Sequence, residues 1–276
     1  MSTAAKGSLE GGFVAKKSFG QNFLHNEKII DKIIQTGEIS ENDAILEIGP
    51  GHGALTKKLV LSPAREIILC EKDDFLFEEI KKKYDLKKTK VIHQDALTLI
   101  PSLIVRKPFK VISNLPYNIS SPVIISLLSV CPTTPDKMVL MLQKEVAQRL
   151  IAPVGDSNRG WLTALVEMVC EARIAIDVSR YNFTPVPKVE SSVLEMKNIV
   201  MPRDFSVKQA IRVLKAGFVS KRKKIKNSLF GFFKVPQEKV TSLSDKYKID
   251  INLRAEDLTK ENWIDLIREF KDLGLI

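Results

Sequence analysis

The sequence is poor in the residue types that build disulfide frameworks and metal sites. Its 276 residues include only three cysteines and three histidines. Cys70, Cys131 and Cys170 lie far apart in apolar runs, so we interpret them as core thiols of a cytosolic protein. The histidines do not cluster either. We therefore expect no metal in this protein.

Long apolar segments are also missing. The longest strongly apolar stretch, residues 123–131, is far shorter than the roughly 20 residues that a membrane-spanning helix needs. Residues 1–14 lack the apolar core of a signal peptide and the arginine richness of a transit peptide. We expect a cytoplasmic monomer that contacts no membrane, with residues 1–15 as a flexible tail.

The excess of positive charge is concentrated in one region. The net charge is +10, and residues 201–250 hold 13 Lys and Arg against four Asp and Glu. At the centre of this region lie five basic residues with no acid between them, namely Lys221, Arg222, Lys223, Lys224 and Lys226. Basic side chains confined to one region are typical of a surface that binds RNA phosphates. A solvated helix face is the alternative interpretation.

A glycine-rich loop follows the first short apolar run. Residues 44–48 are predicted to form a buried parallel strand, and Gly49, Gly51 and Gly53 follow it at spacings of two. Glycine adopts a positive φ cheaply and lets a flat ligand approach the backbone. The pattern E-x-G-x-G-x-G is the type that wraps S-adenosylmethionine. The different spacing G-x-G-x-x-G marks dinucleotide sites, which argues against a nicotinamide-dependent oxidoreductase. An ordinary strand–helix turn is the alternative.

Acidic residues end the next two predicted strands. Glu71 ends the strand at 66–71, and Asp95 lies at the end of the strand at 90–96. Nucleotide ligands of open α/β sheets bind beyond the carboxyl ends of the strands. We predict that Glu71 accepts hydrogen bonds from the cofactor ribose and that Asp95 accepts one from the cofactor adenine. For Glu71, a role near the start of the following helix is the alternative.

The segment after the fourth predicted strand, residues 110–113, is suited to a nucleobase amine. It reads Asn114-Leu115-Pro116-Tyr117. The lone pair of an adenine amine is conjugated into the ring, which makes the nitrogen a poor nucleophile. The Asn114 amide and nearby carbonyls can hold both N–H groups, and Tyr117 can stack on a base that is unpaired or flipped out. A plain turn is the alternative.

The order of predicted elements indicates an α/β fold followed by helices. Short apolar strands alternate with helices in the first 200 residues, which is the pattern of a mainly parallel sheet. Seven strands are predicted, at 44–48, 66–71, 90–96, 110–113, 136–142, 172–178 and 192–196. After residue 202 the apolar residues recur at helical spacing. We predict a seven-stranded Rossmann-like S-adenosylmethionine-dependent methyltransferase domain at 16–200 and a small helical, basic, RNA-binding domain at 201–276.

Together these motifs resemble the bacterial small-subunit (16S) ribosomal RNA adenine dimethyltransferase family. The resemblance runs from residue 16 to near the C-terminus and includes segments 17–24, 47–53, 114–120, 182–192 and 254–258. It implies transfer of methyl groups from S-adenosylmethionine to the exocyclic amines of two adjacent adenosines. The family's target lies in a hairpin loop near the 3′ end of 16S rRNA. The products would be N6,N6-dimethyladenosines and S-adenosylhomocysteine, formed during small-subunit biogenesis.

The resemblance also implies the site residues. The implied cofactor contacts are Gln21, Asn22, Leu24, Gly49, Gly51, Glu71, Asp95, Ala96 and Asn114. The residues implied around the target adenine are Asn114, Leu115, Pro116, Tyr117 and Phe183.

Two other functions stay open. The chain could modify large-subunit (23S) rRNA and confer antibiotic resistance, or it could be a nucleic-acid-binding factor for ribosome assembly or transcription. Residues 114–120 and 254–258 favour the small subunit. The intact segment from Asn114 to Tyr117 argues against a purely binding role.

Overall fold

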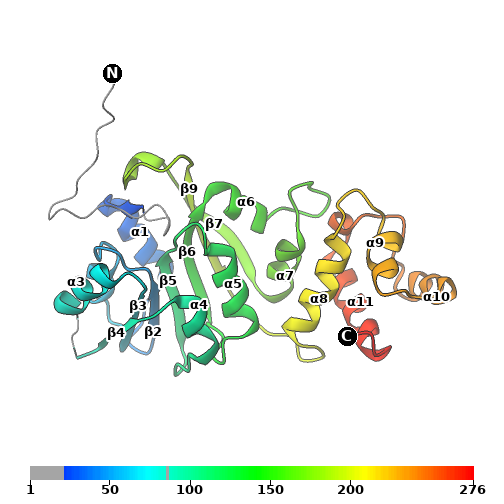
Figure 1. Ribbon diagram of the computed structural model, residues 1–276, viewed down its shortest axis with the longest axis horizontal. Helices are drawn as coiled ribbons and strands as arrows, with labels where there is room; N and C mark the ends of the chain where they lie inside the picture. The colour runs from blue at the N-terminus through cyan, green and yellow to red at the C-terminus, as the bar shows by residue number, and fades with distance from the viewer. Residues whose placement is uncertain (1–21, 85–86) are drawn as a thin grey trace, which may run out of the picture. The chain divides into compact units, whose positions relative to one another are not determined.

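The computed structural model describes residues 22–84 and 87–276 (Figure 1). Gln21, one of the implied cofactor contacts, lies outside the described residues. The chain divides into two compact units. The first runs up to Ala147 and includes 173–197, and the second consists of 148–172 and 198–276. Segment 148–172 therefore belongs to the second unit by packing, and our functional division at residue 200 stays a prediction.

A seven-stranded sheet with the order β4-β3-β2-β5-β6-β9-β7 forms the centre of the first unit. Its strands are β2 (Ala44–Ile48), β3 (Glu66–Glu71), β4 (Thr89–His93), β5 (Phe109–Asn114), β6 (Lys137–Gln143), β7 (Glu171–Val178) and β9 (Ser191–Lys197). The first five strands in this order pair in parallel, and β9 runs antiparallel to β6. The predicted seven-stranded α/β fold is confirmed.

Helices cover both sides of this sheet (Figure 1). They are α1 (Glu27–Gly37), α2 (Thr56–Leu59), α3 (Asp74–Tyr84), α4 (Ala96–Leu99), α5 (Ser120–Ser129) and α6 (Lys144–Leu150), with short 3₁₀ turns η2 (Ile100–Ser102) and η3 (Arg180–Asn182). Helix α1 begins after Asn26, whose side chain accepts a hydrogen bond from the Lys28 amide at 3.0 Å. It packs Ile30 and Ile33 into the same apolar core as Ile45 of β2.

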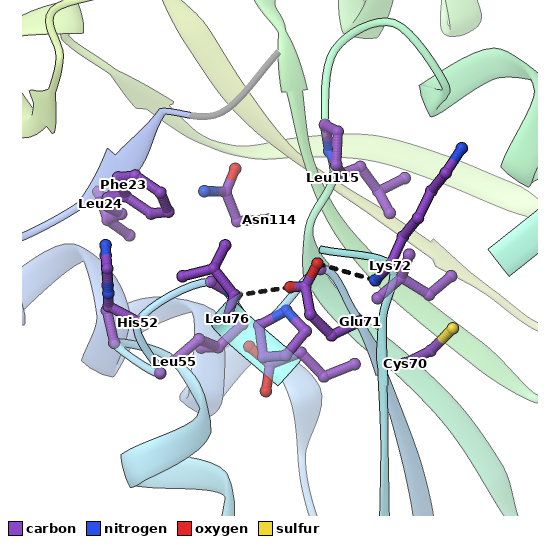
Figure 2. Close-up of a pocket in the computed structure, with 18 of the residues that line it drawn as sticks. Phe23, Leu24, His52, Leu55, Cys70, Glu71, Lys72, Leu76, Asn114 and Leu115 are labelled. Carbon is purple, nitrogen blue, oxygen red and sulfur yellow. Dashed lines mark hydrogen bonds between the residues drawn. The ribbon is translucent and has the colours of Figure 1, made fainter. Parts of the chain in front are cut away.

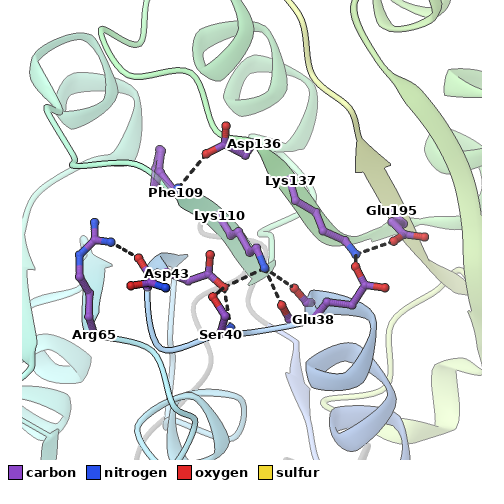
Figure 3. A network of polar contacts seen from close by, with 11 residues as sticks. Glu38, Ser40, Asp43, Arg65, Phe109, Lys110, Asp136, Lys137 and Glu195 are labelled. Carbon is purple, nitrogen blue, oxygen red and sulfur yellow. Dashed lines mark hydrogen bonds and ion pairs between the residues drawn. The ribbon is translucent and has the colours of Figure 1, made fainter.

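A network of ion pairs fixes the amino-terminal ends of β5 and β6 (Figure 3). The Lys110 ammonium lies 2.8 Å from the buried Asp43 carboxylate. The Lys137 ammonium lies 2.7 Å from both Glu38 and Glu195. Except for Glu38, whose side chain is exposed, these charges are buried or half-buried in pairs, which avoids the cost of an isolated buried charge. The network therefore anchors the end of the sheet where the strands begin.

The second unit is helical. It contains α7 (Trp161–Val169), α8 (Val207–Phe218), α9 (Ile225–Phe232), α10 (Gln237–Tyr247) and α11 (Lys260–Asp272), with the 3₁₀ turn η4 (Ala255–Asp257). Helices α8 and α11 meet closely, since a Cβ atom at Gly217 would lie 2.4 Å from the buried Trp263 ring. The predicted C-terminal helices are confirmed.

Candidate active site

A cavity of about 660 Å³ lies at the carboxyl ends of β2, β3 and β5 (Figure 2). Its volume falls within the range of small-molecule sites. The lining includes the glycine-rich loop and the residues that follow the strand ends. Of the predicted site residues, the cavity brings together Asn22, Leu24, Gly49, Gly51, Glu71, Asp95, Ala96, Asn114, Leu115, Pro116 and Tyr117.

The glycine-rich loop needs its glycines for its own packing. Gly49, Gly51 and Gly53 have φ angles of +66°, +59° and +83°, which side chains rarely allow. A Cβ atom at Gly51 would lie 2.9 Å from the Phe23 ring, and one at Gly53 would lie 2.6 Å from the Tyr84 ring. We expected the missing Cβ atoms to make room for a ligand. At these two positions they make room for protein rings.

Glu71 ends β3 with its carboxylate facing the loop. One oxygen accepts a hydrogen bond from the Lys72 amide at 2.8 Å (Figure 2) and another from the Asp73 amide at 2.9 Å. The other oxygen accepts one from the Gly51 amide at 3.3 Å. The residue is only 6% exposed, and this burial raises the pKa of the carboxyl, while the three amides oppose the shift. Glu71 is thus a fixed acceptor on the cavity wall.

A second carboxyl group lies close behind the first. Glu47 is buried in β2 and accepts a hydrogen bond from the Thr56 hydroxyl at 2.7 Å. Burial raises the pKa of Glu47 to about 8, and the nearby Glu71 charge adds to the rise. Glu47 is therefore mainly neutral at pH 7, so it adds little repulsion to the charge of Glu71.

Asp95 is the residue before α4 and lies two positions after the end of β4, whereas we predicted it within a strand at 90–96. Its Oδ1 accepts a hydrogen bond from the Leu97 amide at 2.8 Å, and its Oδ2 pairs with the Lys72 ammonium at 2.8 Å. The Lys72 hydrogen bond lowers the pKa of Asp95. Strand β4 ends at His93, and Asp95 caps the next helix while still lining the cavity with Ala96.

Asn114 points its side-chain amide into the cavity (Figure 2). The Asn114 Nδ2 donates to the Asn22 carbonyl at 3.2 Å. This bond fixes the orientation of the Asn114 amide, because Nδ2 has to face the Asn22 carbonyl. The Oδ1 accepts no hydrogen bond from the residues that the structure describes. An oriented acceptor is therefore present where an amine can reach it.

The residues after Asn114 form a tight turn into α5. The Leu115 amide donates to the Met141 carbonyl at 3.2 Å, and the Ile119 amide donates to Pro116 at 3.1 Å. The Tyr117 hydroxyl lies 2.6 Å from the Ser191 hydroxyl, which holds its ring in place. Burial raises the pKa of Tyr117, so the phenol stays neutral at physiological pH.

Phe183 was predicted to lie around the target adenine, but it does not line the cavity. It lies in the two-residue strand β8 (Phe183–Thr184), which pairs antiparallel with β1 (Phe23–Leu24). Its ring is 1% exposed in the apolar core, and Thr184 lines the cavity instead. Stacking of a base on Phe183 stays a prediction, and it requires the ring to become uncovered first.

The sequence analysis did not predict two features of the site, namely the position of Phe23 and the pair of His52 with Glu79. The small β1–β8 sheet brings Phe23 over the glycine-rich loop, and the Phe23 ring lies 4.5 Å from the His52 ring. The His52 Nδ1 lies 2.9 Å from the Glu79 carboxylate on α3. Phe23 belongs to the recognised segment 17–24, which was the available signal. Nothing in the sequence indicated the His52–Glu79 pair.

The five basic residues predicted to bind RNA lie in the second unit, in the turn that leads into α9 and in the first turn of that helix. Lys221, Arg222, Lys223 and Lys224 are exposed, and Lys226 is half-buried. The Lys221 ammonium donates to the Ser157 carbonyl at 3.2 Å. None of the five forms an ion pair with a residue that the structure describes. Their charges are therefore not neutralised by acids of residues 22–84 and 87–276.

No group of three or more His, Cys, Asp or Glu side chains within the described residues is arranged to hold a metal ion. None of the helices in the same residues combines the length and apolar character that crossing a membrane requires.

Comparison with known proteins identifies close similarities. Residues 12–272 match the family model "Ribosomal RNA adenine dimethylase". A Ureaplasma urealyticum protein named ribosomal RNA small subunit methyltransferase A is 33% identical, with 96% of this chain and 95% of the relative covered. A protein of the same name from Trichormus variabilis is 35% identical, with 91% and 96% covered.

Solved structures give the same picture. A dimethyladenosine transferase from Plasmodium falciparum aligns with a TM-score of 0.77 at 30% identity, with 91% of this chain and 98% of that chain covered. The 23S rRNA methyltransferase ErmE aligns with a TM-score of 0.68 at 25% identity, with 91% and 100% covered.

Proposed function

Because the chain belongs to the ribosomal RNA adenine dimethylase family and is an S-adenosylmethionine-dependent methyltransferase, we propose that it dimethylates two adjacent adenosines of small-subunit rRNA. The proposed target is the hairpin loop near the 3′ end of 16S rRNA. The relatives named for the small subunit are more similar to this chain than the large-subunit enzyme ErmE, at 33–35% against 25% identity. We propose that it acts in the cytoplasm as a monomer and without a metal.

The observation that carries the proposal is the oriented amide of Asn114 on the wall of the cavity. In our proposal the Asn114 Oδ1 accepts one N–H of the target adenine amine, and a backbone carbonyl beside Leu115 or Pro116 accepts the other. These bonds draw the nitrogen lone pair out of conjugation. The nitrogen becomes cationic as it reacts, so its proton leaves without a strong general base. Tyr117, held by Ser191, provides a face for the adenine ring.

We assign the cofactor to the other side of the same cavity. S-adenosylmethionine supplies an electrophilic methyl group when bound. We propose that the Glu71 carboxylate accepts from its ribose hydroxyls, since it already stands as a fixed acceptor at the end of β3. We propose that Asp95 accepts from the adenine amine through the oxygen that also pairs with Lys72. The remaining proposed contacts on the cavity wall are Asn22, Leu24, Gly49, Gly51 and Ala96.

We further propose that the basic residues at the start of α9 hold RNA phosphates. A loop offers little area for reading sequence, so affinity depends strongly on nearby phosphates. The absence of ion pairs to these five residues within the described chain supports this role, because their charges are available to a polyanion.

Replacing Arg222, Lys223 and Lys224 together by glutamine is expected to weaken binding to ribosomal particles. Each phosphate contact contributes roughly 0.7–0.9 to the slope of log affinity against log salt, so the slope should flatten by about two to three units if all three contact phosphates. Binding of S-adenosylmethionine should not change, because the cavity is lined by residues of the first unit. Particle binding at several salt concentrations measures both quantities.

The matched control replaces Lys81, Lys82 and Lys87, three exposed lysines of the first unit, by glutamine. It removes the same charge from a region that we do not assign to RNA. Equal flattening in both triple variants would mean that only net charge matters. An unchanged slope in the first variant would leave the five residues as a solvated helix face.

Methyl transfer to isolated ribosomal particles tests the function. We expect the protein to transfer radiolabelled methyl groups to small subunits that lack the modification, and not to large subunits. Transfer to large subunits alone would assign the chain to the other substrate class. Binding to particles without any transfer would favour a purely binding role.

A further inference from the structure

An exposed aromatic ring near the cavity has no role in the function proposed above. Tyr181 is 67% exposed in η3, directly before β8. The guanidinium carbon of Arg180 lies 5.1 Å from the centre of its ring, and Arg180 Nη2 donates to the Tyr181 hydroxyl at 3.1 Å. A large ring that is left in water and paired with a cation offers a flat, positively charged face.

The backbone beside this ring is attached to the cavity wall. The His25 amide donates to the Asn182 carbonyl at 3.0 Å, and the Asn26 side chain donates to the Asn182 side chain at 2.7 Å. Thr184, three residues after Tyr181, lines the cavity. Since three extended residues span at most about 10 Å, the Tyr181 backbone lies within that distance of the cavity wall.

The same loop also holds the ring proposed to face the target base. The Arg180 amide donates to the Glu190 carboxylate at 2.8 Å. The next residue, Ser191, is hydrogen-bonded to the Tyr117 hydroxyl at 2.6 Å. Tyr117 and the Arg180–Tyr181 pair are therefore positioned by opposite ends of one short segment, 180–191. Their separation is set by local structure of the first unit.

We propose that Arg180 and Tyr181 form a second base-stacking site, which holds the nucleobase next to the target adenine. The inference rests on the proposed function. A target base that enters the cavity loses its stacking on its neighbour, and that neighbour then needs another flat surface. Aromatic rings and Arg guanidinium planes are the surfaces on which proteins stack single-stranded bases. With two adjacent adenosines as the target, one of them occupies this second site while the other is in the cavity.

Kinetics with Tyr181→Ala test the site. We expect the KM for unmethylated small subunits to rise roughly 5- to 150-fold, the range of one lost base stack, with a smaller change in kcat. Tyr181→Phe keeps the ring and should stay near the wild-type KM. The Kd for S-adenosylmethionine, measured by calorimetry, should be unchanged in both variants. The control is Ile104→Ala, another exposed apolar residue, at 82%, which precedes β5 at the opposite end of the strand from Asn114.

The possible results separate the two proposals. An unchanged KM in Tyr181→Ala, or an equal rise in Tyr181→Phe, would overturn the stacking site while leaving the small-subunit function in place. If the wild-type protein methylates only large subunits, the small-subunit function fails. In that case the KM is measured on large subunits. A higher KM in Tyr181→Ala than in the wild type would support the stacking site, and an unchanged KM would overturn it.

Discussion

Replacing Asn114 by alanine is expected to slow methyl transfer to small subunits by about a hundredfold or more. The Asn114 Oδ1 is the oriented acceptor on the cavity wall, and its orientation comes from the hydrogen bond to the Asn22 carbonyl. An acceptor that strengthens as the amine turns cationic acts mainly in the transition state, and one such hydrogen bond is worth on the order of 10²–10³ in kcat. Single-turnover transfer under saturating cofactor measures the rate of the chemical step.

The substitution should leave particle binding nearly intact, because the proposed phosphate contacts lie elsewhere in the chain. Affinity for small subunits, measured by co-sedimentation, is therefore the control. A near wild-type turnover rate in Asn114→Ala would show that the amide does not hold the target amine. A parallel loss of particle binding would instead indicate that the variant is damaged beyond the cavity.

Replacing Glu71 by alanine is expected to weaken S-adenosylmethionine binding by roughly 10- to 150-fold. Loss of a charge-assisted hydrogen bond costs on the order of 1.5–3 kcal/mol. The carboxylate also accepts from the Gly51, Lys72 and Asp73 amides, so its removal loosens the glycine-rich loop as well. Calorimetric titration with S-adenosylmethionine gives the affinity directly.

Glu66→Ala is the matched control, since Glu66 lies at the opposite end of the same strand β3. It should bind the cofactor like the wild type. Thermal unfolding without cofactor separates binding from folding. A Glu71→Ala protein with lower stability and unchanged cofactor affinity would assign the carboxylate only to the start of α3, the alternative that the sequence left open.

The central sheet could be predicted because its signal is local. Most strands are short apolar runs that end at a polar residue, and a run such as 66–71 can be recognised without knowledge of distant segments. The strand at 90–96 is shorter than predicted and ends at His93. Asp95 adopts extended backbone and caps α4 with its side chain, so a helix cap interrupts what looked like continuous strand.

Other features of the site depend on contacts between distant residues. Strands β1 and β8 have two residues each, and they exist because Leu24 pairs with Phe183. No periodic pattern can appear in so short a strand. The same holds outside the cavity for Arg159, a buried charged residue in a polar loop of the second unit. Its guanidinium donates to the carbonyl of the distant Leu258 at 3.5 Å, as well as to the nearby Ala152 carbonyl and Glu167. Burial of this kind is decided by its partners and not by local composition.

The most direct test of the account is the chemical identity of the product. Small subunits that lack the modification are incubated with the protein and S-adenosylmethionine carrying a deuterated methyl group, and their RNA is digested to nucleosides for mass spectrometry. The account predicts N6,N6-dimethyladenosine with both methyl groups labelled, from small-subunit RNA only, and its loss with Asn114→Ala. Label on another nucleoside, or on large-subunit RNA alone, would contradict it.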